Sequence, residues 1–479
     1  MSQLDPSLDV VRANWPELSA HRILSRPQVI VLAVLAVAVI ASALLRPTAL
    51  LITLLALTTA LYLATLLYRV VLLRVALRHP AEVRITDAEA RAIPDAELPV
   101  YTILVPAYRE AHVIARTIAA LERLDYPLDR LDVKLLLEAD DRDTIAAARA
   151  VASPLATEIV LVRPGSPRTK PKACNVGLLR AKGELVTIYD AEDRPEPLQL
   201  RRVVAAFRRL PPLVACLQAK LSYHNIGQNL LTRWFTAEYE TWFSMMLPAL
   251  ARIGGPIPLG GTSMHMPRTI LEAVGAWDPH NVTEDADLGV RLQRLGYQVA
   301  VLDSTTLEEA NSDVVNWVRQ RSRWYKGYLQ TWLVHMRQPL RLWREVGWRA
   351  FVGINLLLGA IPLVAVLNPV FWFLTALWFL VQPHALTVLL PAPIYYPALV
   401  SMLAGNFIAL YIGLVAIQVR RRPDLLAAVI LSPLYWALMS IAAIRALVQL
   451  VVAPSFWEKS VHGLDPTPAV DLVRDHAGR

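Results

Sequence analysis

Leu185-Val186-Thr187-Ile188-Tyr189-Asp190-Ala191-Glu192-Asp193 is the stretch of sequence that decides the fold of this chain. Its first five residues are apolar, β-branched or aromatic, and they predict a short buried strand. Three carboxylates follow where that strand ends. In α/β proteins, ligands lie beyond the carboxyl ends of parallel strands. The stretch therefore predicts an α/β domain with a polar site at one edge of its sheet.

Further strands and helices alternate before this stretch. The pattern predicts strands at 100–106, 133–137 and 158–162, and helices at 114–124, 144–152 and 173–181. Such alternation favours a mostly parallel sheet with helices packed against it.

Two more of these strands end in polar side chains. Tyr108 and Glu110 follow the first strand, and Asp140 and Asp141 follow the second. A single acidic strand end is usually a turn or a helix cap. Three acidic strand ends at one sheet edge repel one another unless a cation compensates. The sequence therefore predicts a divalent metal, Mg²⁺ or Mn²⁺, that bridges a diphosphate.

Composition indicates a membrane protein. Of the 479 residues 55% are hydrophobic, which exceeds the share in ordinary soluble domains. Segments 28–45 and 48–68 carry no charge, and each is long enough to cross a bilayer core of about 30 Å. We expect a transmembrane hairpin at 28–68 rather than a cleaved signal peptide, because a long polar stretch precedes it.

Apolar sequence returns after a soluble middle. Four further spans are predicted, at 351–366, 370–386, 397–419 and 425–452, which makes six in all. Pro362 and Pro369 could instead shape one broken element from the first two of these. The predicted division of the chain is a tail at 1–27, the hairpin, a soluble domain at 69–312, interfacial helices at 313–350, spans at 351–453 and a tail at 454–479.

Basic residues near the span ends set the expected orientation. Positive charge favours the cytoplasm for the N-terminal tail and for the segment that follows the hairpin, through Arg12, Arg22, Arg26, Arg69, Arg74 and Arg78. Six spans would then place 420–422, three arginines, outside. An error in the number of C-terminal spans is the expected cause of that conflict.

Charge and cysteine content exclude other classes. The net charge of +8 follows from basic membrane edges, and no nucleic-acid-binding module accompanies it. The two cysteines, Cys174 and Cys216, lack metal-type spacing and agree with a reducing compartment.

Two later motifs each allow a structural and a functional interpretation. Thr283-Glu284-Asp285 could begin a helix, with Thr283 as its cap, or it could supply a carboxylate for general-base chemistry. Gln320-Arg321-Ser322-Arg323-Trp324 lies on a predicted helix at 314–336, where Gln320, Arg323 and Trp324 share one face. That helix could anchor at a membrane surface. Alternatively, Trp could stack on a sugar ring and Arg could bind phosphate oxygens.

The joint order of these motifs, from about 99 to 332, resembles the membrane-integrated processive family 2 glycosyltransferases, which include cellulose synthase and hyaluronan synthase. The resemblance implies a GT-A catalytic domain at 69–312 between transmembrane helices, in the bacterial inner membrane with the domain cytoplasmic. It implies an inverting transfer of a sugar from a nucleotide-sugar donor to the non-reducing end of a growing β-glycan, which then crosses the bilayer. UDP-glucose is the first expected donor and GDP-mannose the second.

The resemblance also implies roles for individual residues. Asp285 is the expected general base. The expected donor-binding residues are Tyr108, Glu110, Asp140, Asp141, Lys172, Asn175, Asp190, Gln320 and Arg323. Asp190 and Glu192 occupy the ends of the metal-binding Asp-x-Asp motif; because the second member here is Glu, Asp193 could be the direct ligand instead.

The acceptor is expected against Trp324, Gly261, Thr262 and Glu284, where the Gly260-Gly261 pair allows close backbone approach. Beyond the last span, the segment that contains Trp457, Lys459 and His462 resembles the gating segments of these synthases, although a polar tail is the ordinary alternative. A polyprenyl-phosphate glycosyltransferase is the second hypothesis, and a non-catalytic transporter or receptor the third. The sugar, the linkage and any auxiliary subunits stay open.

Overall fold

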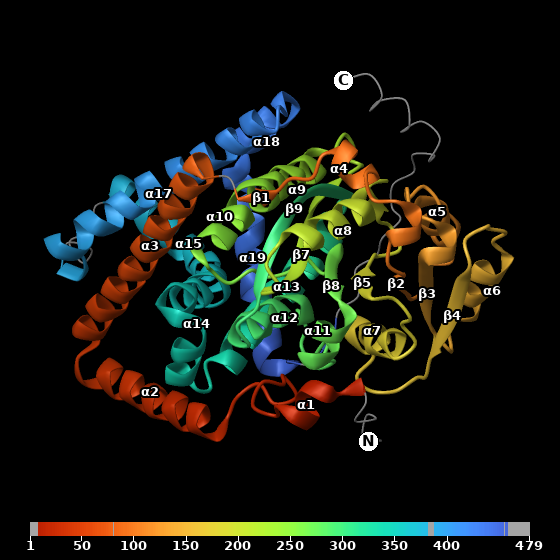
Figure 1. Ribbon diagram of the computed structural model, residues 1–479. Helices are drawn as coiled ribbons and strands as arrows, with labels where there is room; N and C mark the ends of the chain where they lie inside the picture. Colours follow the sequence, from red (N-terminus) through yellow and green to blue (C-terminus); the bar gives the residue numbers. More distant parts are fainter. Residues whose placement is uncertain (1–7, 80, 382–387, 455, 458–479) are drawn as a thin grey trace.

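The protein is described by a computed structural model over residues 8–79, 81–381, 388–454 and 456–457. One mixed sheet carries helices on its faces, and most of the long apolar helices lie to the left of it (Figure 1). The strands are β1 (Glu82–Val83), β2 (Tyr101–Ala107), β3 (Leu131–Glu138), β4 (Thr157–Val162), β5 (Leu185–Ile188), β6 (Arg194–Pro195), β7 (Val214–Tyr223), β8 (Met264–Pro267) and β9 (Gln298–Glu308).

The sheet has the strand order β1-β9-β7-β8-β5-β2-β3-β4, with β6 paired to β9. β2 runs parallel to both β3 and β5, with Val105 opposite Leu135 and Leu104 opposite Ile188. β8 is antiparallel to its neighbours β5 and β7. β3 and β5 are buried along almost their whole length, as strands covered on both faces require. The predicted GT-A-like α/β sheet is confirmed.

Helices connect and cover these strands. They are α4 (Asp87–Arg91), α5 (Ile114–Leu121), α6 (Arg142–Ala150), α7 (Lys170–Leu178), α8 (Gln199–Arg209), α9 (Leu230–Thr241), α10 (Leu247–Ile253), α11 (Arg268–Ala273), α12 (Glu284–Arg294) and α13 (Val314–His335). The predicted elements differ from the observed ones by three residues or fewer at either end, which is the usual fraying of helix and strand boundaries.

Five helices are long and apolar enough to cross a membrane, judged by length and composition. They are α2 (Arg26–Leu45), α3 (Pro47–Arg78), the continuous run Pro339–Val381, α17 (Ala392–Val419) and α19 (Ser432–Val452). The spans predicted at 351–366 and 370–386 are not separate up to residue 381, where the description of this part ends, because α14 (Pro339–Ile354) and α15 (Ile361–Val381) join through a π-helical turn; this agrees better with the alternative of one element that contains Pro362 and Pro369. The described residues therefore hold five candidate spans rather than six.

Six spans would have placed the arginines at 420–422 on the outer side. When the two spans before α17 are counted as one, these arginines fall on the inner side. Arg420 Nε lies 3.0 Å from Glu240 Oε2, and Arg422 Nη1 lies 4.0 Å from Glu240 Oε1. Glu240 belongs to α9, so the end of α17 lies against the soluble domain. The basic residues are therefore on the same side as the domain, as their charge predicts.

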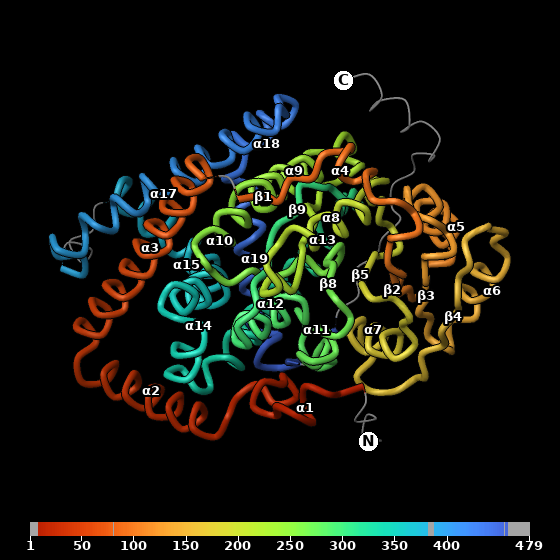
Figure 2. The backbone as a smooth tube through the Cα atoms, in the orientation of Figure 1, coloured from red at the N-terminus to blue at the C-terminus, as the bar shows by residue number. Residues whose placement is uncertain are grey.

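The N-terminal segment packs on the soluble domain. Figure 2 shows α1 (Val10–Asn14) below α11 and α7. Ala20 N donates to Asp278 Oδ2 at 2.6 Å, and His280 Nε2 lies 3.0 Å from Asp9 Oδ2. The residues that precede α2 are thus fixed to the loop that leads into α12.

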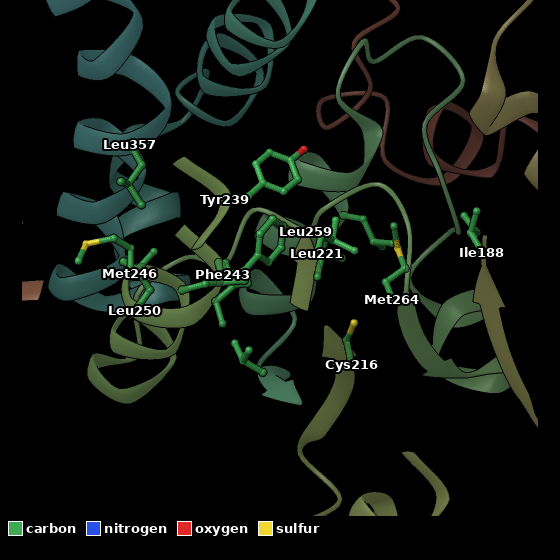
Figure 3. Close-up of a cluster of buried hydrophobic side chains, with 14 of the residues drawn as sticks. Ile188, Cys216, Leu221, Tyr239, Phe243, Met246, Leu250, Leu259, Met264 and Leu357 are labelled. Atoms are coloured by element: carbon green, nitrogen blue, oxygen red, sulfur yellow. The ribbon is translucent and has the colours of Figure 1, made fainter. Parts of the chain in front are cut away.

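One hydrophobic core joins the sheet to the candidate membrane helices. In Figure 3, Ile188 and Met264 lie at the sheet end of a cluster that continues through Phe243 and Met246 to Leu357. Leu357 belongs to the run that leads into α15. Because these side chains share one close-packed core, the soluble domain and the apolar helices are held as a unit.

Candidate active site

A single cavity of about 860 Å³ joins the strand ends of the sheet to the apolar helices. Its lining includes residues of α3, α15, α17 and α19 as well as of the sheet edge. The predicted site residues that line it are Tyr108, Glu110, Asp190, Glu192, Gly261, Glu284, Asp285, Gln320, Arg323, Trp324 and Trp457. Six others do not line it: Asp140, Asp141, Lys172, Asn175, Asp193 and Thr262. Lys459 and His462 lie outside the described residues.

Lys170 is a basic residue of the cavity lining that pairs with Asp190. Its Nζ lies 2.5 Å from Asp190 Oδ1 and donates to Gly261 O at 3.0 Å. Burial would lower the pKa of Lys170, but the Asp190 carboxylate and Glu284 raise it overall. An ammonium held between carboxylates in this way stays charged and can meet an anionic ligand.

Sequence reasoning chose Lys172 instead. The structure directs Lys172 away from the cavity, where its Nζ donates to Arg163 O at 2.7 Å and to Gly165 O at 3.3 Å. Two residues along a helix turn a side chain through about 200°, so Lys170 and Lys172 face opposite sides of α7. Lys172 is expected only from the family resemblance, whereas α7 begins at Lys170, three residues before the predicted helix start at 173.

Asp193 stabilises the turn formed by residues 190–193 through two hydrogen bonds. Its Oδ2 accepts from Asp190 N at 2.8 Å and from Thr262 Oγ1. Its Oδ1 is buried and has no hydrogen-bond partner among the described residues. Burial and the charges of Asp190 and Glu192 raise the pKa of Asp193.

These carboxylates offer the oxygen-only chemistry that a divalent cation takes. Glu308, at the end of β9, lines the same part of the cavity, and its pKa is raised by burial and by the carboxylates of Asp193, Asp190 and Glu192. All the ligand atoms that Asp190, Asp193 and Glu308 could offer are carboxylate oxygens. Mg²⁺ and Mn²⁺ prefer oxygen ligands of this kind. Glu308 was not singled out by sequence, because it lies far from the 190–193 turn along the chain.

Asp285 lies at the first turn of α12 and faces Gly261. A Cβ built on Gly261 would lie 3.0 Å from Asp285 Oδ2, and the φ of Gly261 is +82°. Gly261 therefore has both a conformational and a steric reason to be glycine. Burial raises the pKa of Asp285 to about 6, and it raises that of Glu284 to about 8. A carboxylate with a pKa near 6 suits a general base at neutral pH.

Thr283 precedes α12 as its cap residue, but its side chain makes no capping hydrogen bond. The loop that leads to it is held by α13 instead. Gln330 Oε1 accepts from Val282 N at 3.1 Å, and Asn281 Nδ2 donates to Thr331 Oγ1 at 3.0 Å. The helix that carries the Gln320–Trp324 motif thus also positions Asp285.

Arg168 joins two strand ends at the entrance of the cavity. It donates to Tyr108 Oη at 3.1 Å and to Asp140 Oδ2 at 2.9 Å. Sequence reasoning named both partners but missed Arg168, which lies in the loop before α7. Asp141 instead caps α6. Its Oδ1 accepts a hydrogen bond from Thr144 N at 3.3 Å, and its Oδ2 accepts one from Arg109 N at 2.5 Å.

Asn175 holds the N-terminal segment. Its Nδ2 donates to Trp277 O at 2.8 Å and to Leu8 O at 2.9 Å. Both amide hydrogens are therefore committed to backbone carbonyls outside the cavity. The expected nucleotide contact of Asn175 has no support in this placement.

Gln320, Arg323 and Trp324 of α13 all line the cavity, as their spacing predicts. Gln320 Oε1 accepts from Asn311 Nδ2 at 2.8 Å. The Arg323 guanidinium carbon lies 4.8 Å from the centre of the Trp457 ring. Lys326 Nζ donates to Phe456 O at 2.5 Å. The chain beyond α19 therefore returns to α13, next to the residues of the motif.

The part of the cavity among the apolar helices carries hydroxyl groups. Thr59 Oγ1 and Ser401 Oγ are buried and have no hydrogen-bond partner among the described residues. Tyr62 Oη donates to Asn368 Oδ1 at 2.5 Å. These polar groups lie among the helices that are long and apolar enough to cross a membrane.

Comparison with known proteins agrees with this geometry. Residues 99–327 match the family described as glycosyltransferase like family 2. The probable glycosyltransferase YdaM of Bacillus subtilis (strain 168) is 27% identical over 252 residues, which is 52% of this chain and 60% of that protein. The beta-monoglucosyldiacylglycerol synthase of Synechocystis sp. (strain ATCC 27184 / PCC 6803 / Kazusa) is 28% identical over 394 residues, 78% of this chain and 77% of that protein.

The fold has a solved counterpart. A mannosyltransferase from Pyrobaculum calidifontis, in complex with GDP-Man and Mn²⁺, superposes with a TM-score of 0.53 at 23% identity. The match covers 84% of this chain and 99% of that one. Residues 99–327 thus match a family 2 glycosyltransferase domain, and the sheet order agrees with the fold of the mannosyltransferase.

Proposed function

We propose that this protein is an inverting, metal-dependent synthase that transfers a sugar from a nucleotide-sugar donor to the end of a growing β-glycan and passes the product through its apolar helices. The observation that carries this proposal is the continuity of the cavity, which includes both Asp285 and Ser401 in its lining. A product made at Asp285 would need no separate path to reach those helices.

Different residues of the cavity would carry out different parts of the proposed reaction. Asp285 would take the proton from the acceptor hydroxyl while that oxygen attacks the anomeric carbon of the donor. A new carbon–oxygen bond forms there, and the bond to the nucleoside diphosphate breaks. Lys170 and Arg323 would meet the negative charge of the leaving diphosphate, because both are cationic and line the same cavity as Asp285.

Asp190, Glu192, Asp193 and Glu308 would hold the divalent ion. Bound there, the ion would stabilise the charge that develops on the leaving diphosphate. The mannosyltransferase of the same fold holds GDP-Man and Mn²⁺, which supports a nucleotide-sugar donor and a divalent ion here. UDP-glucose and GDP-mannose are the donors that we propose to test first.

The hydroxyls among the apolar helices favour a glycan as the occupant of that part of the cavity. Thr59 and Ser401 line this part of the cavity, and their hydroxyl groups have no hydrogen-bond partner among the described residues. The aromatic residues Phe371 and Trp372 of the same lining offer flat faces to sugar rings.

A second candidate is the transfer of one sugar to a lipid acceptor. The alignment with the Synechocystis glycolipid synthase covers 78% of this chain, so it extends well beyond the family 2 domain. A lipid hydroxyl, such as that of a diacylglycerol, would enter the same cavity from the membrane side. On either candidate the protein is placed in the inner membrane, with the catalytic domain on the cytoplasmic side.

One assay separates these candidates. Purified protein is supplied with radiolabelled UDP- and GDP-sugars, native membrane lipids, and Mg²⁺ or Mn²⁺, and the products are partitioned between water and chloroform–methanol. The glycan proposal predicts label in a water-phase polymer that linkage-specific β-glycan hydrolases digest. Label in a monoglycosylated lipid would favour the second candidate, and failure to turn over every donor would refute both.

A further inference from the structure

Arg321 is the one charged residue of the Gln320–Trp324 motif that neither the sequence comparison nor the proposed chemistry uses. It is 7% exposed, and its guanidinium carbon lies 4.7 Å from the centre of the Trp324 ring. The same carbon lies 5.2 Å from the rings of Phe235 and Trp317. A buried guanidinium thus lies among three aromatic rings beside the cavity.

Glu238 holds this guanidinium through both of its carboxylate oxygens. Arg321 Nη1 donates to Glu238 Oε1 at 2.8 Å, and Nη2 donates to Oε2 at 2.5 Å. Such a two-point pair holds the plane of the guanidinium, which a lysine cannot reproduce. The Arg321 side chain is buried and that of Glu238 is half-buried, so water screens this attraction only in part.

The pair also connects three helices. Glu238 belongs to α9 and Arg321 to α13, and Tyr435 of α19 donates to Glu238 Oε2 at 2.7 Å. Arg321 Nη2 donates to Tyr435 Oη at 3.2 Å in return. All three residues line the cavity beside Trp324. The orientation of one aromatic wall is therefore tied to the candidate membrane helix that leads to Trp457.

We propose that Arg321 is a positioning residue that fixes the plane of Trp324 for the acceptor sugar, and that Glu238 and Tyr435 hold Arg321 in place. The inference rests on the proposed function, because it assigns Trp324 to the acceptor. The Arg321 guanidinium lies against the Trp324 ring. The centres of the Tyr239 and Trp324 rings are 6.5 Å apart, and the ring planes are inclined by 29°. The ring is thereby constrained before any acceptor arrives, which lowers the cost of ordering it.

The first test needs no substrate. The full-length protein is labelled with 5-fluorotryptophan in detergent, and the ¹⁹F resonance of Trp324 is identified among the 13 tryptophans by its loss in Trp324→Phe. Arg321→Lys should shift and broaden that resonance. Arg319→Lys is the matched control, since Arg319 is exposed on the same helix and does not line the cavity. An unchanged Trp324 resonance in Arg321→Lys would overturn the proposal.

The second test concerns turnover. With UDP-glucose as donor and cellotetraose as acceptor probe, Arg321→Lys should raise the acceptor KM about tenfold, while the KM for UDP-glucose and its hydrolysis without acceptor stay unchanged. Tyr435→Phe should raise the acceptor KM less, because the Arg321–Glu238 pair persists. Equal losses in donor hydrolysis and in transfer would show a merely structural role and overturn the proposal. If UDP-glucose is not turned over by the unaltered protein, the proposed function fails on that donor, and the ¹⁹F result decides the positioning role alone.

Discussion

Lys170 Nζ and Asp190 Oδ1 lie 2.5 Å apart in the cavity, at the end of a buried strand. The pair places an ammonium beside the carboxylates that fit a divalent ion. We predict that Lys170→Met lowers sugar transfer at least about 10²-fold, because a positioned cation that stabilises developing charge contributes on this scale.

Lys182→Met is the control for that change. Lys182 is exposed and does not line the cavity, so its loss should leave transfer within a factor of two of the unaltered protein, given that such surface changes have small effects. Initial rates of nucleoside diphosphate release measure both variants. If Lys170→Met and Lys182→Met have the same rate, Lys170 has no part in the reaction.

The acidity of Asp285 predicts a pH profile. Burial raises the pKa of its carboxyl to about 6, and only the ionised form can accept a proton. Transfer should therefore be level above pH 6 and fall about tenfold per pH unit below it. Asp285→Asn should lower transfer about 10²- to 10⁴-fold and abolish this acidic limb in the residual activity. A profile that stays level down to pH 4.5 would exclude Asp285 as the base.

Removal of divalent cations should stop transfer reversibly. Asp190 pairs with Lys170, and the buried Asp193 Oδ1 has no hydrogen-bond partner among the described residues, so a divalent ion would compensate the remaining negative charge. Mn²⁺ binding can be followed by electron paramagnetic resonance without any turnover. Asp190→Asn should weaken Mn²⁺ binding about tenfold or more, whereas Asp140→Asn, which lies outside the cavity lining, should not. Equal Mn²⁺ affinity in the two variants would contradict the assignment.

Contact between α13 and the loop before α12 predicts a stability effect. A Cβ on Gly327 would overlap Thr283 Cγ2 and Oγ1. Gly327→Ala should therefore lower the free energy of unfolding by about 1–3 kcal/mol and reduce transfer, because Thr283 precedes Asp285. Gly227→Ala is the control, since a Cβ there meets nothing within 4 Å. Thermal unfolding in detergent compares the two, and equal stability would show that Thr283 is not held by α13.

The sheet and its acidic edge were predictable because they depend on local pattern. The apolar run at 185–189 and the carboxylates that follow it identify a strand and its end without reference to the rest of the chain. The same holds for the face shared by Gln320, Arg323 and Trp324, because helical spacing alone sets it.

The structure differs from the sequence-based expectation where tertiary contacts determine the position of a residue. Lys170 and Lys172 are chemically alike, and only the observed start of α7 tells which one faces the cavity. Asn175 resembled a ligand-binding residue, but its partners include Leu8, which lies 167 positions away in sequence. The two spans predicted around Pro369 are one helix, because neighbouring helices stabilise a proline inside an apolar run.

The most direct test of the account is synthesis in sealed proteoliposomes that present the catalytic domain outward. Radiolabelled donor and Mg²⁺ or Mn²⁺ are added outside, and β-glycan hydrolase is added after synthesis, with or without detergent. The account predicts a labelled polymer that resists the hydrolase until detergent opens the vesicles, and no polymer from Asp285→Asn. Polymer that is digested without detergent, or label found only in monoglycosylated lipid, would contradict the claim that the cavity carries a glycan from Asp285 across the membrane.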